Sequence, residues 1–322
     1  MHRIPLPLPN DGLRAVNVYA IEDGPGLVLI DSGWALEESR RRLETALAEL
    51  GRDLGDITRF LVTHVHRDHY TQALVVRRLL GTRVALGTGE APVLAEIRSH
   101  IGTFPPQMLL RLRAAGAAGL ARQLIAAAGP DEGTQAGDWE DPDEWLTGGT
   151  DIALASRTLR AIATPGHTRG HLVFHDHQAG LLFAGDHVLP HITPSIGFEP
   201  LPADRPLADY LHSLEAIEAL GDAVLLPAHG PVAPSARTRA GELIEHHRKR
   251  LDAMLAAVGP EVSTAFEVAG QVGWTSRGRA LADMDFFNQM LAVNETIAHL
   301  DVLADRGALR AEESGGVRHY RR

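Results

Sequence analysis

The chain has 322 residues, 44% of them hydrophobic and 22% charged, which is the composition of an ordinary globular protein. Its net charge of −10 at pH 7 argues against a general nucleic-acid-binding protein, and the absence of cysteine excludes disulfide bonds and thiolate metal sites. The length predicts one large α/β unit with an appended region. Residues 1–7 lack the apolar stretch of a signal peptide, and no uncharged apolar run could cross a bilayer, so we expect a cytoplasmic protein without a membrane partner.

Predicted strands and helices alternate over the first 90 residues. The strands are expected at 15–21, 27–30, 57–62 and 84–87, and the helices at 36–50 and 72–80. Asn17 is the polar break in the first of these strands. Asp31 follows the second, where it can cap the next helix or accept a hydrogen bond that orients a metal-binding histidine. The histidine-rich segment that follows favours the second role.

Metal-binding side chains are concentrated directly after the strand at 57–62. The segment is Thr63-His64-Val65-His66-Arg67-Asp68-His69-Tyr70. Imidazole and carboxylate groups are ligands that suit zinc, whereas a core without metal would have to satisfy each of them with hydrogen bonds. His64 and His66 share one face if the chain is extended, and Asp68 and His69 can face a second ion. The segment therefore predicts a metal site, with a merely histidine-rich polar loop as the alternative.

Residues 91–146 interrupt the alternation of strands and helices. Helical stretches are expected at 109–113 and 119–128, and we interpret the whole segment as a helical insertion that could cap the site. Its aromatic residues could line a pocket, although packing of the insertion onto the body is the more common role. These residues are Phe104, Trp139 and Trp145.

Further strand ends in the second half carry polar residues. Strands are expected at 152–154, 159–163, 172–175, 181–184 and 223–226, with a helix at 207–220. His167, Asp186 and His229 each come just after one of these strands. Because strand ends can converge on one edge of stacked sheets, we expect these residues to join the cluster at 64–69.

The segment after residue 237 is predicted to be mainly helical. Helices are expected at 242–258, 265–272 and 283–306, followed by a hairpin formed by 309–310 and 317–320, which is a winged-helix pattern. His246 and His247 lie in a stretch rich in charge and are expected to be solvated. From residue 242 onward ten Lys and Arg face twelve Asp and Glu, so binding of nucleic acid through this segment is not expected.

These motifs together resemble those of the metallo-β-lactamase fold hydrolases, over about residues 10–235 without the insertion. The motifs are Asp-Ser-Gly at 31–33, Thr-His-x-His-x-Asp-His at 63–69, Thr-Pro-Gly-His-Thr at 164–168, Gly-Asp at 185–186 and Pro-Ala-His-Gly at 227–230. The resemblance implies an α+β fold, a four-layer αββα sandwich in a catalytic domain of residues 1–236, with a winged-helix-like domain at 237–322. The Gly-Asp motif, and the absence of the cysteine found in common β-lactamases, resemble the glyoxalase II, lactonase and phosphodiesterase branches, of which the glyoxalase II-like branch is favoured, although the basic C-terminal pattern that binds glutathione is not seen.

The resemblance also implies roles for individual residues. Two Zn²⁺ ions per chain are expected, with iron or manganese possible. One ion would be held by His64, His66 and His167, the other by Asp68, His69 and His229, with Asp186 bridging them. Asp31 would orient a ligand from behind, and His171 would be structural. Tyr70, His187 and His191 are possible substrate contacts, although a structural role is expected more for the two histidines.

The expected activity is hydrolysis of an ester, thioester or lactone by a hydroxide that bridges the two ions. Asp68 would orient this hydroxide and shuttle the proton that water gives up when the hydroxide forms. A phosphodiesterase or ribonuclease is the main alternative, and a mono-iron persulfide dioxygenase is a less favoured one. A DNA-binding regulator that needs metal is the non-enzymatic alternative. The expected partner is a small-molecule substrate, and the C-terminal segment could close the pocket or form a homodimer.

Overall fold

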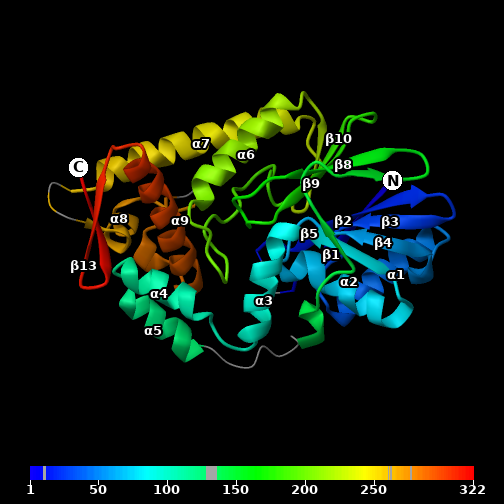
Figure 1. Ribbon diagram of the computed structural model, residues 1–322, viewed down its shortest axis with the longest axis horizontal. Helices are drawn as coiled ribbons and strands as arrows, with labels where there is room; N and C mark the ends of the chain where they lie inside the picture. Colours follow the sequence, from blue (N-terminus) through cyan, green and yellow to red (C-terminus); the bar gives the residue numbers. More distant parts are fainter. Residues whose placement is uncertain (10–11, 128–135, 260, 262, 276–277) are drawn as a thin grey trace.

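The computed structural model describes residues 1–9, 12–127, 136–259, 261, 263–275 and 278–322. Two β-sheets lie against each other in one half of the molecule, and helices with a small third sheet form the other half (Figure 1). Short 3₁₀ turns occur at Leu54–Asp56, Thr88–Glu90, Ala136–Trp139 and Leu281–Asp283. Among the described helices, none is both long and apolar enough to cross a membrane.

The first sheet has the strand order β1-β2-β3-β4-β5-β6. Its strands are β1 (His2–Pro7), β2 (Ala15–Asp23), β3 (Gly26–Ile30), β4 (Ile57–Leu61), β5 (Arg83–Gly87) and β6 (Glu144–Leu146). The first three strands pair antiparallel and the others join in parallel. Parallel neighbours require crossover connections, which α1 (Glu37–Glu49) and α2 (Arg67–Leu80) provide between β3, β4 and β5. Both helices pack their apolar sides on the outer face of this sheet.

The edge strand β1 was not predicted from the sequence. It contains Pro5 and Pro7, which lack the N–H group that a central strand must donate. The strand nevertheless pairs with β2 along its whole length, because an edge strand has one side without a neighbour. Ile4 and Leu6 hold it in place by packing into the core beneath the sheet.

The second sheet has the order β11-β10-β9-β8-β7. Its strands are β7 (Asp151–Ala153), β8 (Thr158–Ala163), β9 (Leu172–Asp176), β10 (Leu181–Gly185) and β11 (Val224–Pro227). Buried side chains of the two sheets form a shared core, in which the Tyr19 and Phe183 rings meet edge to face at 5.4 Å. Helix α6 (Pro206–Ala219) covers the outer face of the second sheet. The predicted αββα layering is therefore confirmed.

The expected insertion contains three helices, α3 (Ala91–Ser99), α4 (Pro106–Ala114) and α5 (Ala118–Ala127). The first of them was not predicted, and Ala128, the expected end of the last, lies outside the described residues. Trp139 and Trp145 pack with the first sheet and its helices, whereas Phe104 packs with α4 and α5 in the core that holds the C-terminal helices. These aromatic residues therefore join the insertion to both halves of the molecule.

The C-terminal segment combines three helices and a three-stranded antiparallel sheet of order β12-β14-β13. The elements are α7 (Ala236–Ala257), β12 (Ser263–Thr264), α8 (Ala265–Gln271), α9 (Phe286–Asp305), β13 (Arg310–Ser314) and β14 (Val317–Arg321). Thr264 starts α8 with a capping box, in which its hydroxyl accepts from the Glu267 N–H and the Glu267 carboxylate accepts from the Thr264 N–H. The helices predicted from 242 onward are thus present, together with the hairpin.

The expectation that His247 is solvated was wrong. His247 and His299 are both fully buried between α7 and α9, with Nδ1 of the first 3.2 Å from Nε2 of the second. Burial lowers the pKa of His247 well below its ordinary value and lowers the pKa of His299 to about 3. Tyr210, Arg250 and the exposed His246 are the polar side chains around the pair. The two imidazoles are therefore neutral in the folded protein at neutral pH.

We expect this buried pair to make the protein less stable in mild acid. Because the pKa of His299 is lowered on folding, the unfolded chain takes up the proton first as the pH falls below about 6.5, so stability is lost between about pH 6.5 and 3. From pH 7.5 to 5.5 the wild type should lose about 1.4 kcal/mol more than His299→Gln. Urea unfolding at both pH values measures this difference. His212→Gln on the exposed face of α6 is the control, and an equal loss in all three proteins would contradict the prediction.

Candidate metal centre

Seven side chains that can bind metal meet at one edge of the two sheets. His64 and His66 follow β4, and Asp68 and His69 lie in the first turn of α2. His167, Asp186 and His229 follow β8, β10 and β11 of the second sheet. Helix α2 starts at Arg67 rather than at the expected 72, so its first turn carries Asp68, an acidic residue that favours a helix N-terminus. The two sheets thus each contribute part of one cluster.

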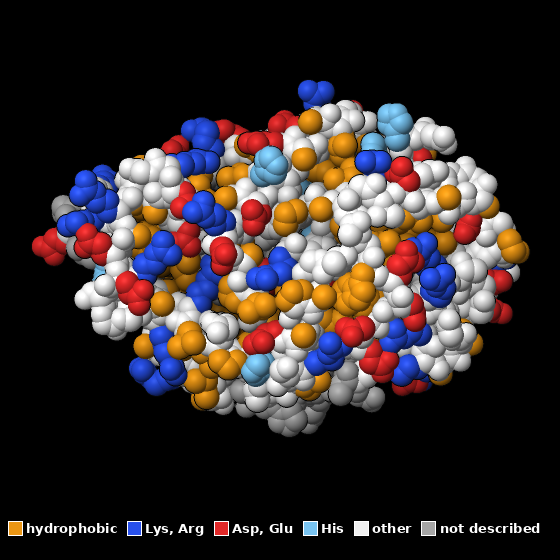
Figure 2. All heavy atoms as spheres, in the orientation of Figure 1, with side chains coloured by type: hydrophobic (Ala, Val, Ile, Leu, Met, Phe, Trp, Pro, Cys, Tyr) orange, Lys and Arg blue, Asp and Glu red, His pale blue; other side chains and the backbone are white. Residues whose placement is uncertain are grey.

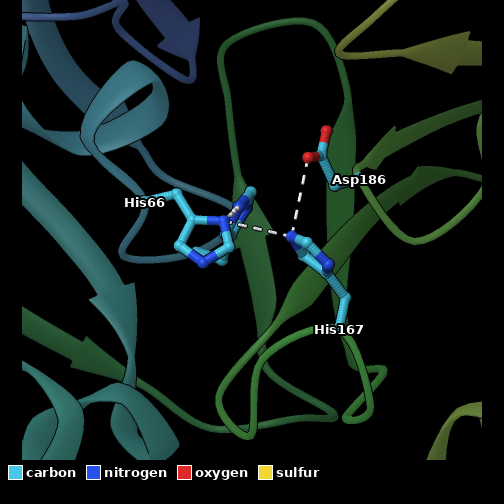
Figure 3. A group of neighbouring side chains, drawn as sticks. His66, His167 and Asp186 are labelled. Carbon is cyan, nitrogen blue, oxygen red and sulfur yellow. Dashed lines mark hydrogen bonds and ion pairs between the residues drawn. The ribbon is translucent and has the colours of Figure 1, made fainter. Parts of the chain in front are cut away.

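Three imidazoles form the first half of the cluster. His66 Nδ1 lies 3.0 Å from His64 Nε2 and 3.1 Å from His167 Nε2. Figure 3 shows the rings of His66 and His167 directed toward one another, with the Asp186 carboxylate beside them. Asp186 Oδ2 is 3.5 Å from His167 Nε2. Two ligands of a tetrahedral zinc ion are about 3.3 Å apart, given Zn–N bonds of about 2.0–2.1 Å, so this spacing fits such an ion.

The second half combines two imidazoles and two carboxylates. His229 Nε2 lies 3.3 Å from Asp68 Oδ2 and 3.3 Å from Asp186 Oδ1. His69 Nε2 lies 3.5 Å from Asp68 Oδ2 and 3.6 Å from Asp186 Oδ1. Asp186 therefore directs one carboxylate oxygen to each half of the cluster. This placement of one carboxylate between two groups of ligand atoms is what a pair of cations requires.

Three of the candidate ligand atoms have no hydrogen-bond partner, and this tests whether a metal fits the site. Among the described residues, the ring nitrogen Nε2 of His69 and of His229 and Oδ1 of Asp186 are buried without a hydrogen bond. Buried polar atoms normally have partners, and a bound cation would supply them here. The Nδ1 atoms of these and two other histidines are engaged elsewhere: His64 with Thr63 Oγ1, His69 with Asp31, His167 with the Ser195 carbonyl and His229 with the Ala15 carbonyl. Each ring is thus fixed with Nε2 directed inward.

Asp31 positions residues of the centre through hydrogen bonds. Its Oδ2 lies 3.0 Å from His69 Nδ1, and its Oδ1 accepts hydrogen bonds from the N–H and hydroxyl of Thr63. The backbone of Asp31 has a φ of 60°, a left-handed conformation that Asp adopts more readily than most residues. One carboxylate therefore positions both His69 and the residue that precedes His64.

The first sheet also holds the turn that carries His229. Asn17 donates from Nδ2 to the Pro227 and Gly230 carbonyls, and the Tyr19 hydroxyl donates to the Pro227 carbonyl. The sequence showed Asn17 only as a polar break in an apolar strand, and its partners lie more than 200 positions away in the chain. Its position inside the strand was the available signal, but nothing local indicated which segment it contacts.

The pattern of the Metallo-beta-lactamase superfamily matches residues 11–229. The chain belongs to this superfamily. The match runs from β2 to β11, which leaves out only the edge strand β1 of the two sheets, and it includes every residue of the centre described above.

Similar proteins support a hydrolytic enzyme. The "Probable metallo-hydrolase YqjP" of Bacillus subtilis is 25% identical over 329 residues, covering 99% of this chain and 96% of that protein. A metallo-beta-lactamase family protein of Thermus thermophilus has 29% identity and a TM-score of 0.80, covering 100% and 98% of the two chains. An "Atrochrysone carboxyl ACP thioesterase" of Aspergillus fumigatus is 28% identical over 76% of this chain, which spans 60% of its length. The chain is thus a metal-dependent hydrolase of the superfamily.

The two halves of the metal centre differ in charge before metal binds. Burial lowers the pKa of His66 to about 3, and repulsion from a protonated His167 would act in the same direction. Burial also lowers the pKa values of His64 and His167, so the first half presents neutral rings. Burial also opposes the charge on His69 and His229, but nearby carboxylates raise their pKa values to about 10 and about 9. The second half therefore carries carboxylate charge that protons, or a cation in their place, must balance.

Two expected substrate contacts are corrected by the structure. Tyr70 is fully buried in the core under the first sheet, and its hydroxyl donates to the Glu140 carbonyl at 2.6 Å. His187 is fully buried behind Asp186, with its ring 5.1 Å from that of Tyr210. Neither side chain is exposed, which argues against a direct contact with substrate. His191 is exposed in the loop before Ser195, and its contact with substrate stays a prediction.

Two further residues near the centre have clear positions. His171 is fully buried, with Nδ1 2.9 Å from Thr164 Oγ1 and Nε2 accepting from the Asp186 N–H, which agrees with a structural role. Phe198, which the sequence did not indicate, places its ring 6.3 Å from that of His66 and 5.5 Å from that of Phe287 on α9. It connects the wall of the centre to the C-terminal helices.

We expect Gly185→Ala to disrupt the centre without unfolding the sheet. A Cβ at Gly185 would lie 2.7 Å from both His171 Nε2 and Thr63 Oγ1, and the φ of 50° is left-handed. The displaced Thr63 and His171 hold His64 and Asp186, so hydrolytic activity should fall at least about 100-fold, or about 2.7 kcal/mol in barrier height. Steady-state kinetics and metal content measure the effect.

The matched control is Gly180→Ala at the start of the same strand. Gly180 also has a left-handed φ, 63°, but a Cβ there would meet nothing within 4 Å. It carries the same backbone strain without the clash, so its activity should stay close to wild type. Equal activities in the two variants would contradict the prediction.

Proposed function

We propose that the chain is a dinuclear-zinc hydrolase that acts on an ester, thioester or lactone. The observation that carries the proposal is the position of Asp186, whose two oxygens face separate groups of ligand atoms. The first ion would be held by His64, His66 and His167, and the second by Asp68, His69 and His229. All donors are imidazole nitrogen or carboxylate oxygen, which suits zinc, and iron or manganese would also accept them.

The bound ions would acidify a water molecule and polarise the acyl oxygen of the substrate. Asp68 is placed to orient that water and take its proton, because its Oδ2 faces His229 and its side chain keeps partial access to solvent. The metal-ligand histidines keep their orientation through the Nδ1 contacts of the surrounding protein. The proton leaving Asp68 can then pass to the departing alcohol or thiol.

A thioester is the substrate class we favour, because the fungal relative named above is an acyl-carrier-protein thioesterase. A phosphodiesterase or ribonuclease is the rival, since such a centre can also cleave phosphodiesters. Figure 2 shows basic and acidic side chains interspersed over the face it presents, which does not favour a nucleic-acid groove there. A mono-iron persulfide dioxygenase is the weaker rival and would need only one ion.

Turnover of a substrate panel tests the proposal. Purified protein should cleave short acyl thioesters, aryl esters or lactones at least about 100-fold faster, in kcat/KM, than bis-p-nitrophenyl phosphate. Activity toward the phosphodiester alone would defeat it. Metal analysis of the same sample should show two zinc ions per chain, and one iron ion per chain would favour the dioxygenase.

We also propose a branch of the superfamily, a type of C-terminal domain and a cellular location for the protein. The Gly-Asp motif at 185–186 supports a place near the glyoxalase II-like branch, and the three helices with a hairpin after residue 236 support a winged-helix-like C-terminal domain. We also propose a small-molecule substrate, a cytoplasmic location and a homodimer formed through the C-terminal segment. Size-exclusion chromatography with light scattering would test the dimer.

A further inference from the structure

A second cavity lies outside the metal centre, between the insertion and the C-terminal segment. It measures about 410 Å³, opens to solvent, and is lined by α4, α9, β14, Ala265 of α8 and the loop 201–204. Figure 1 shows α4 beside the lower end of α9, and the two helices are in contact. The polar side chains that line it are Gln107, Arg111, Asp204, Asp301, Arg318 and Tyr320. The volume is in the range of small-molecule sites.

Arg111, a cationic residue in the wall of the cavity, has no hydrogen-bond or ion-pair partner among the described residues. Arg318 forms an ion pair with Asp301 at 3.1 Å, and the Tyr320 hydroxyl donates to the same carboxylate oxygen. Within the described part of the chain, no hydrogen bond or ion pair involves the Arg111 guanidinium. Burial lowers the pKa of Arg111, and the charge of Asp301 opposes this effect. Arg111 is partly buried in the pocket wall, so a bound anion would supply the hydrogen bonds and opposite charge that the protein does not give its guanidinium.

The other carboxylates near Arg111 do not fill this role. Glu199 acts on it from the loop 195–204, but Glu199 Oε1 accepts from the Arg169 N–H at 2.9 Å. Asp204 is exposed at the rim of the cavity and forms no ion pair with Arg111. The geometry therefore leaves the planar donor group of Arg111 available to a ligand.

We infer that this cavity binds the anionic group of a small molecule, a phosphate or a carboxylate, with Arg111 as the principal contact. A guanidinium donates two parallel hydrogen bonds to either group, which makes arginine the usual side chain for such ligands. Arg318 and the Tyr320 hydroxyl lie on the same wall and can add to the contact. The site is separate from the metal ligands, so it does not depend on the proposed hydrolysis.

The cavity and the metal centre share a wall. On one side of the loop 195–204, the Phe198 ring packs near His66. On the other side, Arg111 Nη2 lies 3.5 Å from where a Cβ of Gly197 would stand, and Gly197 itself has a left-handed φ of 83°. An anion bound at Arg111 therefore contacts the segment that borders the centre.

Calorimetric titration of the metal-loaded protein with inorganic phosphate and with acetate tests the inference. Arg111→Met keeps the apolar stem of the side chain but removes the charge, so folding should be preserved. It should weaken binding of the preferred anion at least about 10-fold. Arg113→Met, an exposed position on the same helix, should bind like the wild type. Phosphate bound at the metals is common to all three proteins and cancels in the comparison.

The two probes distinguish the source of the anion. If the binding that Arg111→Met loses is stronger for phosphate, the natural ligand is a phosphate ester, and if it is stronger for acetate, the natural ligand is a carboxylate; either loss supports the site. Equal binding by the wild type and Arg111→Met, or no binding of either anion by the wild type at millimolar concentration, overturns it. The second readout is the rise in melting temperature on adding the anion, which should be smaller in Arg111→Met than in the wild type and Arg113→Met.

Discussion

Replacing Asp186 by Asn should lower kcat/KM at least about 1,000-fold, the largest effect we expect from one substitution. Asn keeps the size of the side chain, but it replaces one of the two oxygens that face the two halves of the centre and removes the negative charge. A 1,000-fold loss corresponds to about 4 kcal/mol of barrier height. Metal content, measured by mass spectrometry, should fall from two ions per chain to one or none.

Asp252→Asn provides the matched control for this experiment. Asp252 is an exposed carboxylate on α7 that pairs with Arg248, so the same chemical change there should leave both kinetics and metal content unaltered. Circular dichroism should show that both variants are folded. Retention of two ions and of more than a tenth of the activity by Asp186→Asn would show that this carboxylate does not join two metals.

Removing the metal ions with a chelator should abolish activity and lower the melting temperature by about 10 °C. The reason is mass action: an ion present at about 1,000 times its dissociation constant stabilises the folded state by about 4 kcal/mol, and each kcal/mol is worth roughly 2–4 °C in a protein of this size class. The ligand atoms come from both sheets, so metal loss weakens the contact between them. Differential scanning calorimetry and assays before and after chelation measure both effects.

Readdition of zinc should restore activity and stability together, and this reversal separates metal loss from irreversible damage. The Asp186→Asn protein serves as the comparison, because chelation should shift its melting temperature by a smaller amount. Full activity in protein that holds less than a tenth of an ion per chain would contradict the prediction.

Most of the fold followed from the period of apolar residues, and the exceptions have physical causes. The strand β1 was missed because Pro5 and Pro7 argue against a strand, although an edge strand tolerates them. The start of α2 was placed too late, because its first turn carries residues directed at the metal centre and shows no apolar period. Apolar periodicity therefore identifies elements that face the core and is weaker where a functional site determines the side chains.

The residues of the centre could be predicted from their positions after strands, but the direction of each side chain could not. Tyr70 adjoins His69 in sequence, yet neighbours on a helix point about 100° apart, and Tyr70 faces the core. His247 was expected in solvent because charges surround it in sequence. It lies on the buried side of α7 with Leu243, Leu251 and Met254, at helical spacing. This helical spacing with apolar residues indicates a buried position for His247, whereas its charged neighbours in sequence suggest an exposed one.

The hydrogen bonds from Asn17 and Tyr19 of β2 to the turn at 227–230 have a consequence for protein synthesis. Asn17 and Tyr19 leave the ribosome early, whereas their partners and His229 follow more than 200 residues later. The nascent chain can therefore gather the three imidazoles of the first half as soon as His167 has emerged, but it cannot complete the second half until the turn with His229 has been made. In the proposed dinuclear centre, uptake of the second ion would therefore be a late event that follows arrival of β11, the final strand of the sandwich.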